Sequence, residues 1–300
     1  MQQNKNKTTP AIDVSILIRA KNEDKHIGQT LSVLFSQTYM KFEVLIVDSG
    51  STDRTLEIAR EYPVKIYEIK PEDFTYGYSL NYGFERAEGD FVVNLSAHAL
   101  PSSNDWLSTL IDNFNDDRVA AVMSNNLPNP DCNPFDRRGL LKKYAIPKQQ
   151  ISGGPPYIFA NYSSAVRKSV WEKVHYSETL SYAEDHDWAL RVEALGYKII
   201  YEPDAKTYHS HNETLKQIYR RSYMEASARK ILKFQKYTLL NILYDLLAGS
   251  FYDMLYVLFK RDNLKWFLFA PLRRIAINYA RLQASIAVNM DEVKKGADNS

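Results

Sequence analysis

Short apolar runs alternate with polar, helix-patterned segments over the first hundred residues, and this alternation limits the fold of the chain more than any other feature. The runs at residues 14–18, 44–47, 64–69 and 91–95 are typical of strands that are covered on both faces. A repeated order of strand, polar turn and helix specifies βαβ units. We therefore expect an α/β fold with a Rossmann-like, mostly parallel sheet flanked by helices.

The pattern continues more sparsely toward the carboxyl terminus. Residues 119–123 predict another strand, and residues 182–195 predict a helix that ends at Gly196. Beyond residue 211 the chain changes to long helical segments. The expected parts are a tail at residues 1–12, an α/β domain at 13–215, a helical region at 216–290 and a second tail at 291–300.

Composition excludes several classes of protein. With 300 residues, 45% of them hydrophobic and 25% charged, the chain is neither a disulfide-stapled miniprotein nor a disordered segment. Its single cysteine, Cys132, permits no intramolecular disulfide and no cysteine-cluster metal site, which suits a reducing compartment. The first ten residues are polar and do not read as a signal peptide, so we expect a cytoplasmic protein.

The net charge of +2 conceals two regions of opposite sign. Residues 206–281 contain 14 Lys and Arg against 5 Asp and Glu, so the remainder of the chain carries an excess of negative charge. Such a split indicates an anionic partner for the basic region, either membrane lipid, phosphate or nucleic acid. The region lacks the aromatic and glycine motifs of known nucleic-acid-binding modules, so we expect no nucleic acid partner.

Polar clusters follow three of the four expected strands, at residues 19–23, 48–53 and 96–98. Ligands of open α/β sheets bind beyond the carboxyl ends of the strands, so these clusters form the candidate binding site. Asp48 and the run after it offer carboxylates, hydroxyls and a glycine that lets a ligand approach the backbone, as a nucleoside site requires. The alternative is a turn whose polar side chains only cap the next helix.

Five sequence motifs together resemble those of a known family. They are Val14-Ser-Ile-Leu-Ile-Arg-Ala-Lys-Asn22-Glu23, Val47-Asp48-Ser-Gly-Ser-Thr-Asp53, Ser79-Leu-Asn81, Gly89-Asp90, and Glu184-Asp185-x-Asp187-Trp188-x-x-Arg191 with Gly196-Tyr197. Through them, residues 13–215 resemble family 2 glycosyltransferases, which have the GT-A fold. Residues 74–81, 96–101, 208–212 and 215–221 are similar, within that family, to bacterial rhamnosyltransferases and their relatives.

The resemblance implies transfer of a sugar from a nucleotide donor to an acceptor hydroxyl, with inversion at the anomeric carbon, in the synthesis of a bacterial surface glycan. The implied partners are a nucleoside diphosphate sugar and a glycan or lipid-linked acceptor. The implied nucleotide contacts are Ala20, Asn22, Glu23, Asp48, Ser49, Gly50, Asp53, Asn81, Ser96 and Ala97. The alternative is a catalytically silent homologue that binds the nucleotide sugar without turnover, because one family motif is altered.

Transfer to a hydroxyl needs a base for the acceptor proton. The resemblance gives this role to Asp185, beside Glu184, at the start of the expected helix. A helix N-terminus favours ionised carboxylates, whereas repulsion between neighbouring carboxylates raises the pKa of at least one of them. The alternative is a negatively charged first turn that only stabilises its own helix.

Sugar transfer also needs a positive group that neutralises the charge of the departing diphosphate, and the altered motif is the one that supplies this group in the family. The family usually binds Mg²⁺ or Mn²⁺ with an Asp-x-Asp motif, but this chain reads Ser96-Ala97-His98 there. Imidazole binds Mn²⁺ and other transition metals and is a poor ligand for Mg²⁺. We expect a divalent metal, Mn²⁺ or Mg²⁺, at His98 with His209 or His211. The alternative is that imidazoles and nearby Arg or Lys hold the diphosphate without a metal.

Three residues are candidates for contact with the acceptor. Gly153 and Gly154 fall where the family has acceptor-facing elements, and a glycine pair permits loop motion over a bound donor. Trp188 follows Asp185 by three residues, so it is expected to face the acceptor pocket from the same side of the helix. The alternative for the glycine pair is a simple connecting turn.

Residues 237–259 are apolar over a length that can span a bilayer, but a polar residue recurs every four positions at Asn241, Asp245, Gly249 and Asp253. Two Asp in hydrocarbon are costly, so a span is disfavoured. With the basic residues that follow, residues 237–281 fit an amphipathic segment at an anionic membrane surface, and a peripheral location at the inner face of the membrane. The alternative is packing on the α/β domain or on another subunit of a homo-oligomer.

Overall fold

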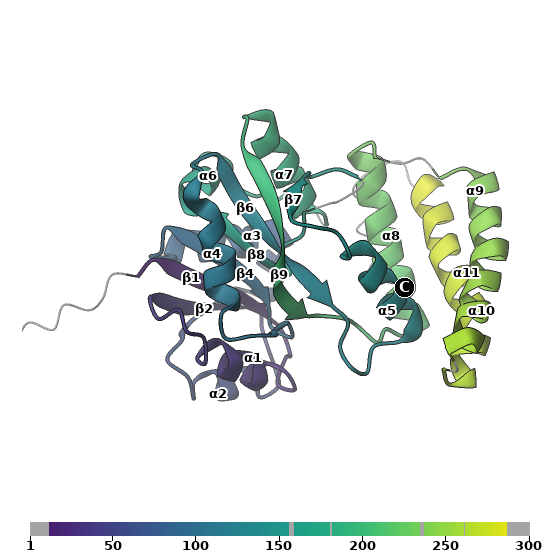
Figure 1. The fold of residues 1–300 in the computed structure, drawn as a ribbon, viewed down its shortest axis with the longest axis horizontal. Helices are drawn as coiled ribbons and strands as arrows, with labels where there is room; N and C mark the ends of the chain where they lie inside the picture. The colour runs from purple at the N-terminus through teal and green to yellow at the C-terminus, as the bar shows by residue number, and fades with distance from the viewer. Residues whose placement is uncertain (1–11, 156–158, 181, 235–236, 261, 287–300) are drawn as a thin grey trace, which may run out of the picture.

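The computed structural model describes residues 12–155, 159–180, 182–234, 237–260 and 262–286. Most of the expected tail at residues 1–12, and all of that at 291–300, lies outside these ranges. The described residues form one α/β sheet with helices on both faces and a layer of helices at one end (Figure 1).

The sheet and its helices are defined as follows. The strands are β1 (Val14–Ala20), β2 (Phe42–Asp48), β3 (Lys65–Glu68), β4 (Phe91–Ser96), β5 (Leu100–Pro101), β6 (Val119–Leu127), β7 (Gln149–Ile151), β8 (Ser163–Arg167) and β9 (Lys198–Tyr208). The α-helices are α1 (Ile27–Leu34), α2 (Thr55–Ala59), α3 (Tyr76–Arg86), α4 (Trp106–Ile111), α5 (Pro134–Lys143), α6 (Lys168–Trp171), α7 (Glu184–Ala194), α8 (Leu215–Ile231), α9 (Leu239–Tyr244), α10 (Ser250–Lys260) and α11 (Leu264–Ile286). Short 3₁₀ turns lie at Pro71–Asp73 and Asp112–Asn115, and a π-helical turn, η3 (Asp245–Gly249), joins α9 to α10.

The first half of the sheet has the predicted parallel arrangement. β1 pairs in parallel with β2 and with β4, and β2 pairs in parallel with β3. The crossovers between these strands contain α1, α2 and α3, as the alternating sequence pattern predicted. β1, β2 and β4 therefore end at the same edge of the sheet, where the polar clusters begin.

The second half of the sheet is mixed, so the expectation of a mostly parallel sheet holds only for the first half. β8 lies antiparallel between β4 and β6, β9 is parallel to β6, and β5 and β7 pair antiparallel with β9. β8 and β9 were not predicted from the sequence. β9 carries charged and polar residues throughout (Lys198-Ile-Ile-Tyr-Glu-Pro-Asp-Ala-Lys-Thr-Tyr208), and β8 begins with two serines, so neither has the apolar run of a buried strand.

Two hydrophobic cores cover the two faces of the sheet. Alternate residues of β1 point to opposite faces, so Leu17 belongs to one core and Ile16 and Ile18 to the other. The first core includes buried residues of α3, α6 and α7, and the second includes those of α1 and α4. The helices therefore fix the sheet from both sides, and only its strand ends remain open to a ligand.

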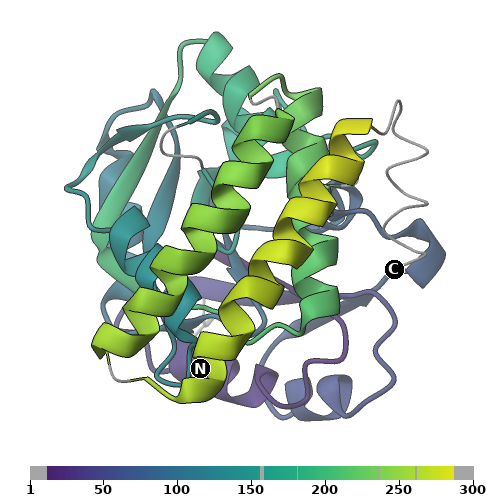
Figure 2. The ribbon, with the colours of Figure 1, turned by 90° about the vertical axis from the view of Figure 1, so that its right-hand side faces the viewer.

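The helices after residue 214 form the layer at one end of the molecule. Thr214 caps α8 in a capping box with Gln217, whose side chain accepts the Thr214 N–H at 2.9 Å. Figure 2 shows α10 and α11 side by side at the surface, with α8 behind them. Leu239–Lys260 is long and apolar enough to cross a membrane by length and composition.

Candidate functional site

The turn after β2 is folded around the carboxylate of Asp48, which is fully buried at the end of the strand. Its Oδ1 accepts the backbone N–H groups of Gly50 at 2.9 Å and of Ser51 at 2.8 Å, and its Oδ2 accepts the Ser51 hydroxyl. Gly50 has a φ of +91°, and a Cβ at this position would lie 2.6 Å from the Pro71 ring. The turn is therefore held in one conformation that requires glycine.

Hydrogen bonds also join this turn to the loop after β1. They run from Ser49 N to Ala20 O (3.1 Å), from Thr52 N to Asn22 Oδ1 (2.8 Å) and from Asp24 N to Asp53 Oδ2 (3.1 Å), and Asp53 Oδ1 also accepts the Thr55 N–H within its own segment (2.9 Å). Most of the residues expected to contact a nucleotide thus meet at the ends of β1 and β2. The carboxylates of Asp48 and Asp53 stabilise the turn by accepting backbone N–H groups, whereas Arg54, the N-cap residue of α2, makes no side-chain cap.

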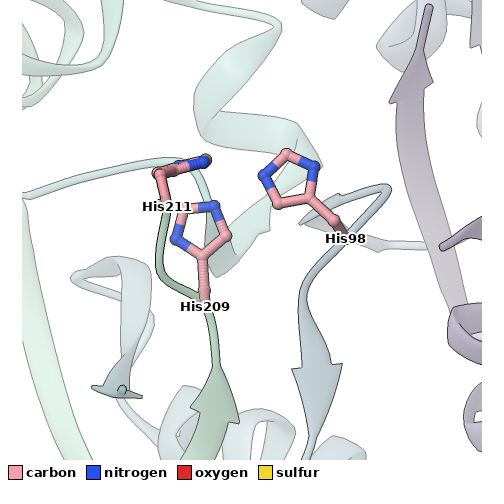
Figure 3. A group of neighbouring side chains, drawn as sticks. All are labelled: His98, His209 and His211. Carbon is pink, nitrogen blue, oxygen red and sulfur yellow. The ribbon is translucent and has the colours of Figure 1, made fainter. Parts of the chain in front are cut away.

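Three histidines come together at the same edge of the sheet (Figure 3). His98 lies between β4 and β5, and His209 and His211 follow β9. Antiparallel pairing of β5 with β9 brings these two segments together. One nitrogen of each ring lies within 4.8 Å of the others, and Figure 3 shows the rings turned toward one another. The sequence left open which of His209 and His211 joins His98, and the structure brings both to it.

Glu23 fixes the orientation of the His98 ring. Its Oε1 lies 2.9 Å from His98 Nδ1, and a carboxylate accepts, so Nδ1 donates to Glu23 and Nε2 is the ring nitrogen that faces away from it. The Ser96 hydroxyl lies 3.2 Å from Nε2. The sequence analysis expected Glu23 and Ser96 to contact the nucleotide, whereas in the structure both contact His98.

The other two imidazoles are uncharged at neutral pH. Burial, and then the neighbouring His211 and His98, hold the pKa of His209 well below its usual value. Desolvation, His98 and Arg221 lower the pKa of His211 to about 4, although solvent still reaches this residue. Each ring therefore has a free lone pair at pH 7, which is the state that a metal ion requires.

The N-terminus of α7 carries the two carboxylates expected to be catalytic. Glu184 is 5% exposed, and burial and the neighbouring Asp185 raise its pKa to about 8, against the lowering effect of Arg19. Oδ2 of Asp185 accepts the Asn161 N–H at 3.1 Å, and Oδ1 accepts the His186 N–H at 2.8 Å. Glu184 is therefore protonated at pH 7, and the expectation that repulsion raises the pKa of one carboxyl group is confirmed.

Two arginines to which the sequence analysis gave no role lie close to these groups. Arg19 is the next-to-last residue of β1, lies over the Tyr76 ring at 5.1 Å from the ring centroid, and lowers the pKa of Glu184 electrostatically. Arg221 of α8 pairs with Glu213 at 2.7 Å and lowers the pKa of His211. The only sequence signals were a charge at the end of a buried strand and the basic excess beyond residue 205. Through Arg221, helix α8 also contributes to the site.

The prediction that Trp188 faces an acceptor pocket is wrong. Its side chain is fully buried in the core, its Nε1 donates to Val174 O at 2.7 Å, and its ring packs against Phe159 and Tyr176. α7 packs on the sheet with the face that carries Trp188, because the ring buries more apolar surface than any other side chain of the helix. The side chain of Trp188, three residues after Asp185, therefore points into the core and not toward the site.

Asn81 is also occupied within the fold. Its Nδ2 donates to Tyr176 O at 3.0 Å and to Glu178 Oε1 at 2.8 Å, and its Oδ1 accepts Trp171 Nε1–H at 2.9 Å and the Tyr176 N–H at 3.0 Å. An amide side chain has two donors and two acceptor lone pairs, so all are used. The expectation that Asn81 contacts the nucleotide is therefore contradicted, and the residue instead ties α3 to the segment before α7.

The glycine pair lies against helices and not over an open site. A Cβ at Gly153 would meet Leu190 N at 2.6 Å and His186 O at 2.7 Å, so glycine permits close packing on α7. A Cβ at Gly154 would lie 3.5 Å from the Phe234 ring. Both glycines are buried, which favours the alternative of a connecting turn over a contact with the acceptor.

The mixed α/β sheet with its polar turns at the strand ends has the GT-A fold of glycosyltransferases. A mannosyltransferase of Pyrobaculum calidifontis in complex with GDP-Man and Mn²⁺ superposes with a TM-score of 0.57 at 20% identity, over 95% of this chain and 79% of that one. TarS 1-349 of S. aureus in complex with UDP superposes with a TM-score of 0.54 at 15% identity, over 95% of this chain and 92% of that one.

Comparison of sequences assigns the chain to a family within this fold. The model of glycosyl transferase family 2 matches residues 15–174, more than half of the chain, and the chain belongs to this family. The O-antigen chain rhamnosyltransferase WbaN of Salmonella anatum is 35% identical over 196 residues, which are 62% of each chain. The O-antigen chain rhamnosyltransferase RfbN of Salmonella typhimurium is 27% identical over 223 residues, which are 70% of each chain. The resemblance noted from the motifs is confirmed.

Proposed function

We propose that the protein is an inverting glycosyltransferase that moves a sugar from a nucleoside diphosphate donor to an acceptor hydroxyl. The observation that carries this proposal is the meeting, in a member of this family, of three histidines with the polar turns at the ends of β1 and β2. The nucleotide would lie against the two joined segments after β1 and β2, residues 20–24 and 48–55, with its diphosphate toward the three histidines.

In this proposal Asp185 is the base. As the acceptor oxygen bonds to the anomeric carbon, the bond from that carbon to the diphosphate breaks, and the acceptor proton passes to the Asp185 carboxylate. The backbone N–H groups of Asn161 and His186 hold that carboxylate in place. Glu184 keeps its proton at pH 7, which limits the negative charge close to the base.

We further propose that His98, His209 and His211 hold a divalent metal together with the donor phosphates. The donor set fits a transition metal: one nitrogen of each of three imidazoles lies within 4.8 Å of the others, and Glu23 contacts His98 from behind. Because no carboxylate belongs to this set of three, it favours Mn²⁺ over Mg²⁺. The metal would neutralise charge on the departing diphosphate.

The proposed sugar and acceptor are inferred from the names of the relatives. Relatives named as O-antigen chain rhamnosyltransferases support transfer of rhamnose or another hexose or deoxyhexose onto a growing, lipid-linked surface glycan. Such an acceptor would place the protein at the cytoplasmic face of the cell membrane, with residues 237–281 toward the lipid. The catalytically silent alternative rested on the missing Asp-x-Asp motif, and the cluster of three histidines supplies another set of metal ligands.

The test measures release of nucleoside diphosphate from a panel of UDP-, GDP- and dTDP-sugars after chelation, with Mn²⁺ or Mg²⁺ added back. We expect turnover of one donor, restoration by Mn²⁺ at lower concentration than by Mg²⁺, and loss of that restoration in His209→Ala. Full turnover under chelation would remove the metal from the proposal. Donor binding in a thermal shift assay without release from any sugar would instead support a silent homologue.

A further inference from the structure

The hairpin of α9, η3, α10 and α11 has its charged side chains on the inside. Asp253 is fully buried in α10, where its carboxylate is 2.6 Å from Arg138 of α5 and 2.7 Å from Arg274 of α11. Asp245 of η3 likewise pairs with Arg274 at 2.7 Å and with Arg281 at 3.0 Å. Asp245, Gly249 and Asp253 of the polar stripe expected from the sequence therefore face the protein, whereas Asn241 is exposed.

The opposite side of the hairpin is apolar and exposed. Nineteen large hydrophobic residues are exposed in the described part of the chain, and fifteen of them lie between residues 239 and 286. On α11 they follow a spacing of three or four residues, which keeps Leu268, Leu272 and Ile275 on one face. On the α9–α10 segment Leu247 is 71% exposed and Phe251 59%.

These two stripes form one continuous surface, which we call the outer face. α10 and α11 lie side by side at the end of the molecule, and Figure 2 shows both of them in front of α8. A monomeric soluble protein rarely exposes an apolar patch of this extent, so the outer face needs a partner. The continuous helical segment Leu239–Lys260 and helix α11 lie in a single layer, and each is about 33 Å long at 1.5 Å per residue. A surface of this shape suits a partner that is broad and flat.

The charges around the outer face favour an anionic partner. Within the described residues 239–286, Lys260 and Lys265 are exposed and Asp262 between them is half-buried, whereas Asp245 and Asp253 are paired on the inner side. Lys265 lies 4.8 Å from the ring centroid of Trp266, beside the turn between α10 and α11. The Trp266 ring packs inward on Phe135 of α5, so Lys260 and Lys265 are the side chains that can meet anionic lipid headgroups at this edge.

We propose that the outer face lies in the plane of an anionic lipid bilayer, with the hairpin resting on the membrane and not crossing it. A span is disfavoured because Asp245, Asp253 and their arginines would enter the hydrocarbon, and because α5 and α8 cover the inner side. This inference does not depend on the proposed sugar transfer.

The test is flotation of the purified full chain with vesicles of phosphatidylcholine alone or with 30% phosphatidylglycerol. We expect the wild type to float with the anionic vesicles and to be released by high salt. Leu247→Glu/Phe251→Glu, and separately Leu268→Glu/Leu272→Glu, should each lower the bound fraction about tenfold or more. The matched control is Met40→Glu/Leu195→Glu, which changes two equally exposed apolar residues elsewhere and should float like the wild type.

Three results would overturn the inference. The first is a wild type that floats with neither vesicle. The second is an outer-face variant that keeps its circular dichroism spectrum and melting temperature and still floats normally. The third is a vesicle-free dimer in light scattering that both outer-face variants convert to monomer, which would identify a second copy as the partner. Flotation needs no donor sugar, so its failure is distinct from a failure of the proposed activity.

Discussion

The protonated Glu184 leads to a prediction on stability that needs no substrate. In the unfolded chain this carboxyl group ionises near its ordinary pKa of 4.5, whereas in the fold burial and Asp185 raise its pKa to about 8. Its contribution to the free energy of unfolding is therefore fully present below pH 4.5 and is lost as the pH rises through 8. Each unit of pKa difference corresponds to about 1.4 kcal/mol, so the loss reaches at most about 5 kcal/mol.

The perturbation is Glu184→Gln, which keeps the shape of the side chain and cannot ionise. Its stability should match the wild type near pH 4.5 and exceed it progressively up to pH 8, because only the wild type loses this contribution. For a chain of this size about 5 kcal/mol corresponds to a difference of about 10 °C or more in melting temperature.

Thermal unfolding followed by circular dichroism in steps from pH 4.5 to 8.5 measures this difference. Glu172→Gln is the matched control, since Glu172 is exposed on the surface, and it should follow the wild type at every pH. A gap between Glu184→Gln and the wild type that stays constant, or narrows as the pH rises, would refute the reasoning about the buried carboxyl group.

The other predictions concern packing, charge and metal binding. Gly153→Ala should destabilise the fold by about 1–3 kcal/mol in urea unfolding, because its Cβ would meet backbone atoms of α7 at 2.6–2.7 Å. Asp253→Ala should cost about 3–5 kcal/mol in the same assay, because it leaves Arg274 and its neighbours without their buried carboxylate. Glu23→Gln should weaken Mn²⁺ binding about 10–100-fold in calorimetry, because His98 loses its orienting acceptor. Unchanged unfolding or binding in any of these variants would contradict the corresponding contact.

The first half of the sheet could be predicted because its strands are buried on both faces. β1 and β2 read as short apolar runs, and the helices between them follow turns rich in Ser, Thr and Asp. β9 could not be predicted, because its side chains alternate between core, site and solvent and leave charged residues along the whole strand. β8 forms a strand because it pairs with β4 and β6, and such long-range pairing leaves no pattern in the local sequence.

The candidate site was predictable where the residue type alone limits its chemistry. His98 was a candidate because it stands in the stretch where the family has Asp-x-Asp, with His209 or His211 as its expected partner, and the pairing of β5 with β9 brings all three together. Trp188 and Asn81 could not be placed from sequence, because a large ring or an amide serves a core as well as a ligand site. The direction of the polar stripe on α9–α10 was equally hidden, since an amphipathic pattern does not say which face meets the protein.

Asp185 is the proposed base of the sugar transfer, and a comparison of the wild type with Asp185→Asn tests this role most directly. The measurement is nucleoside diphosphate release from the donor that the wild type accepts, with Mn²⁺, in the wild type and in Asp185→Asn, alongside donor binding by calorimetry. We predict a fall in turnover of about 10²–10⁴-fold with donor affinity retained. Equal turnover in the two proteins would contradict the central claim.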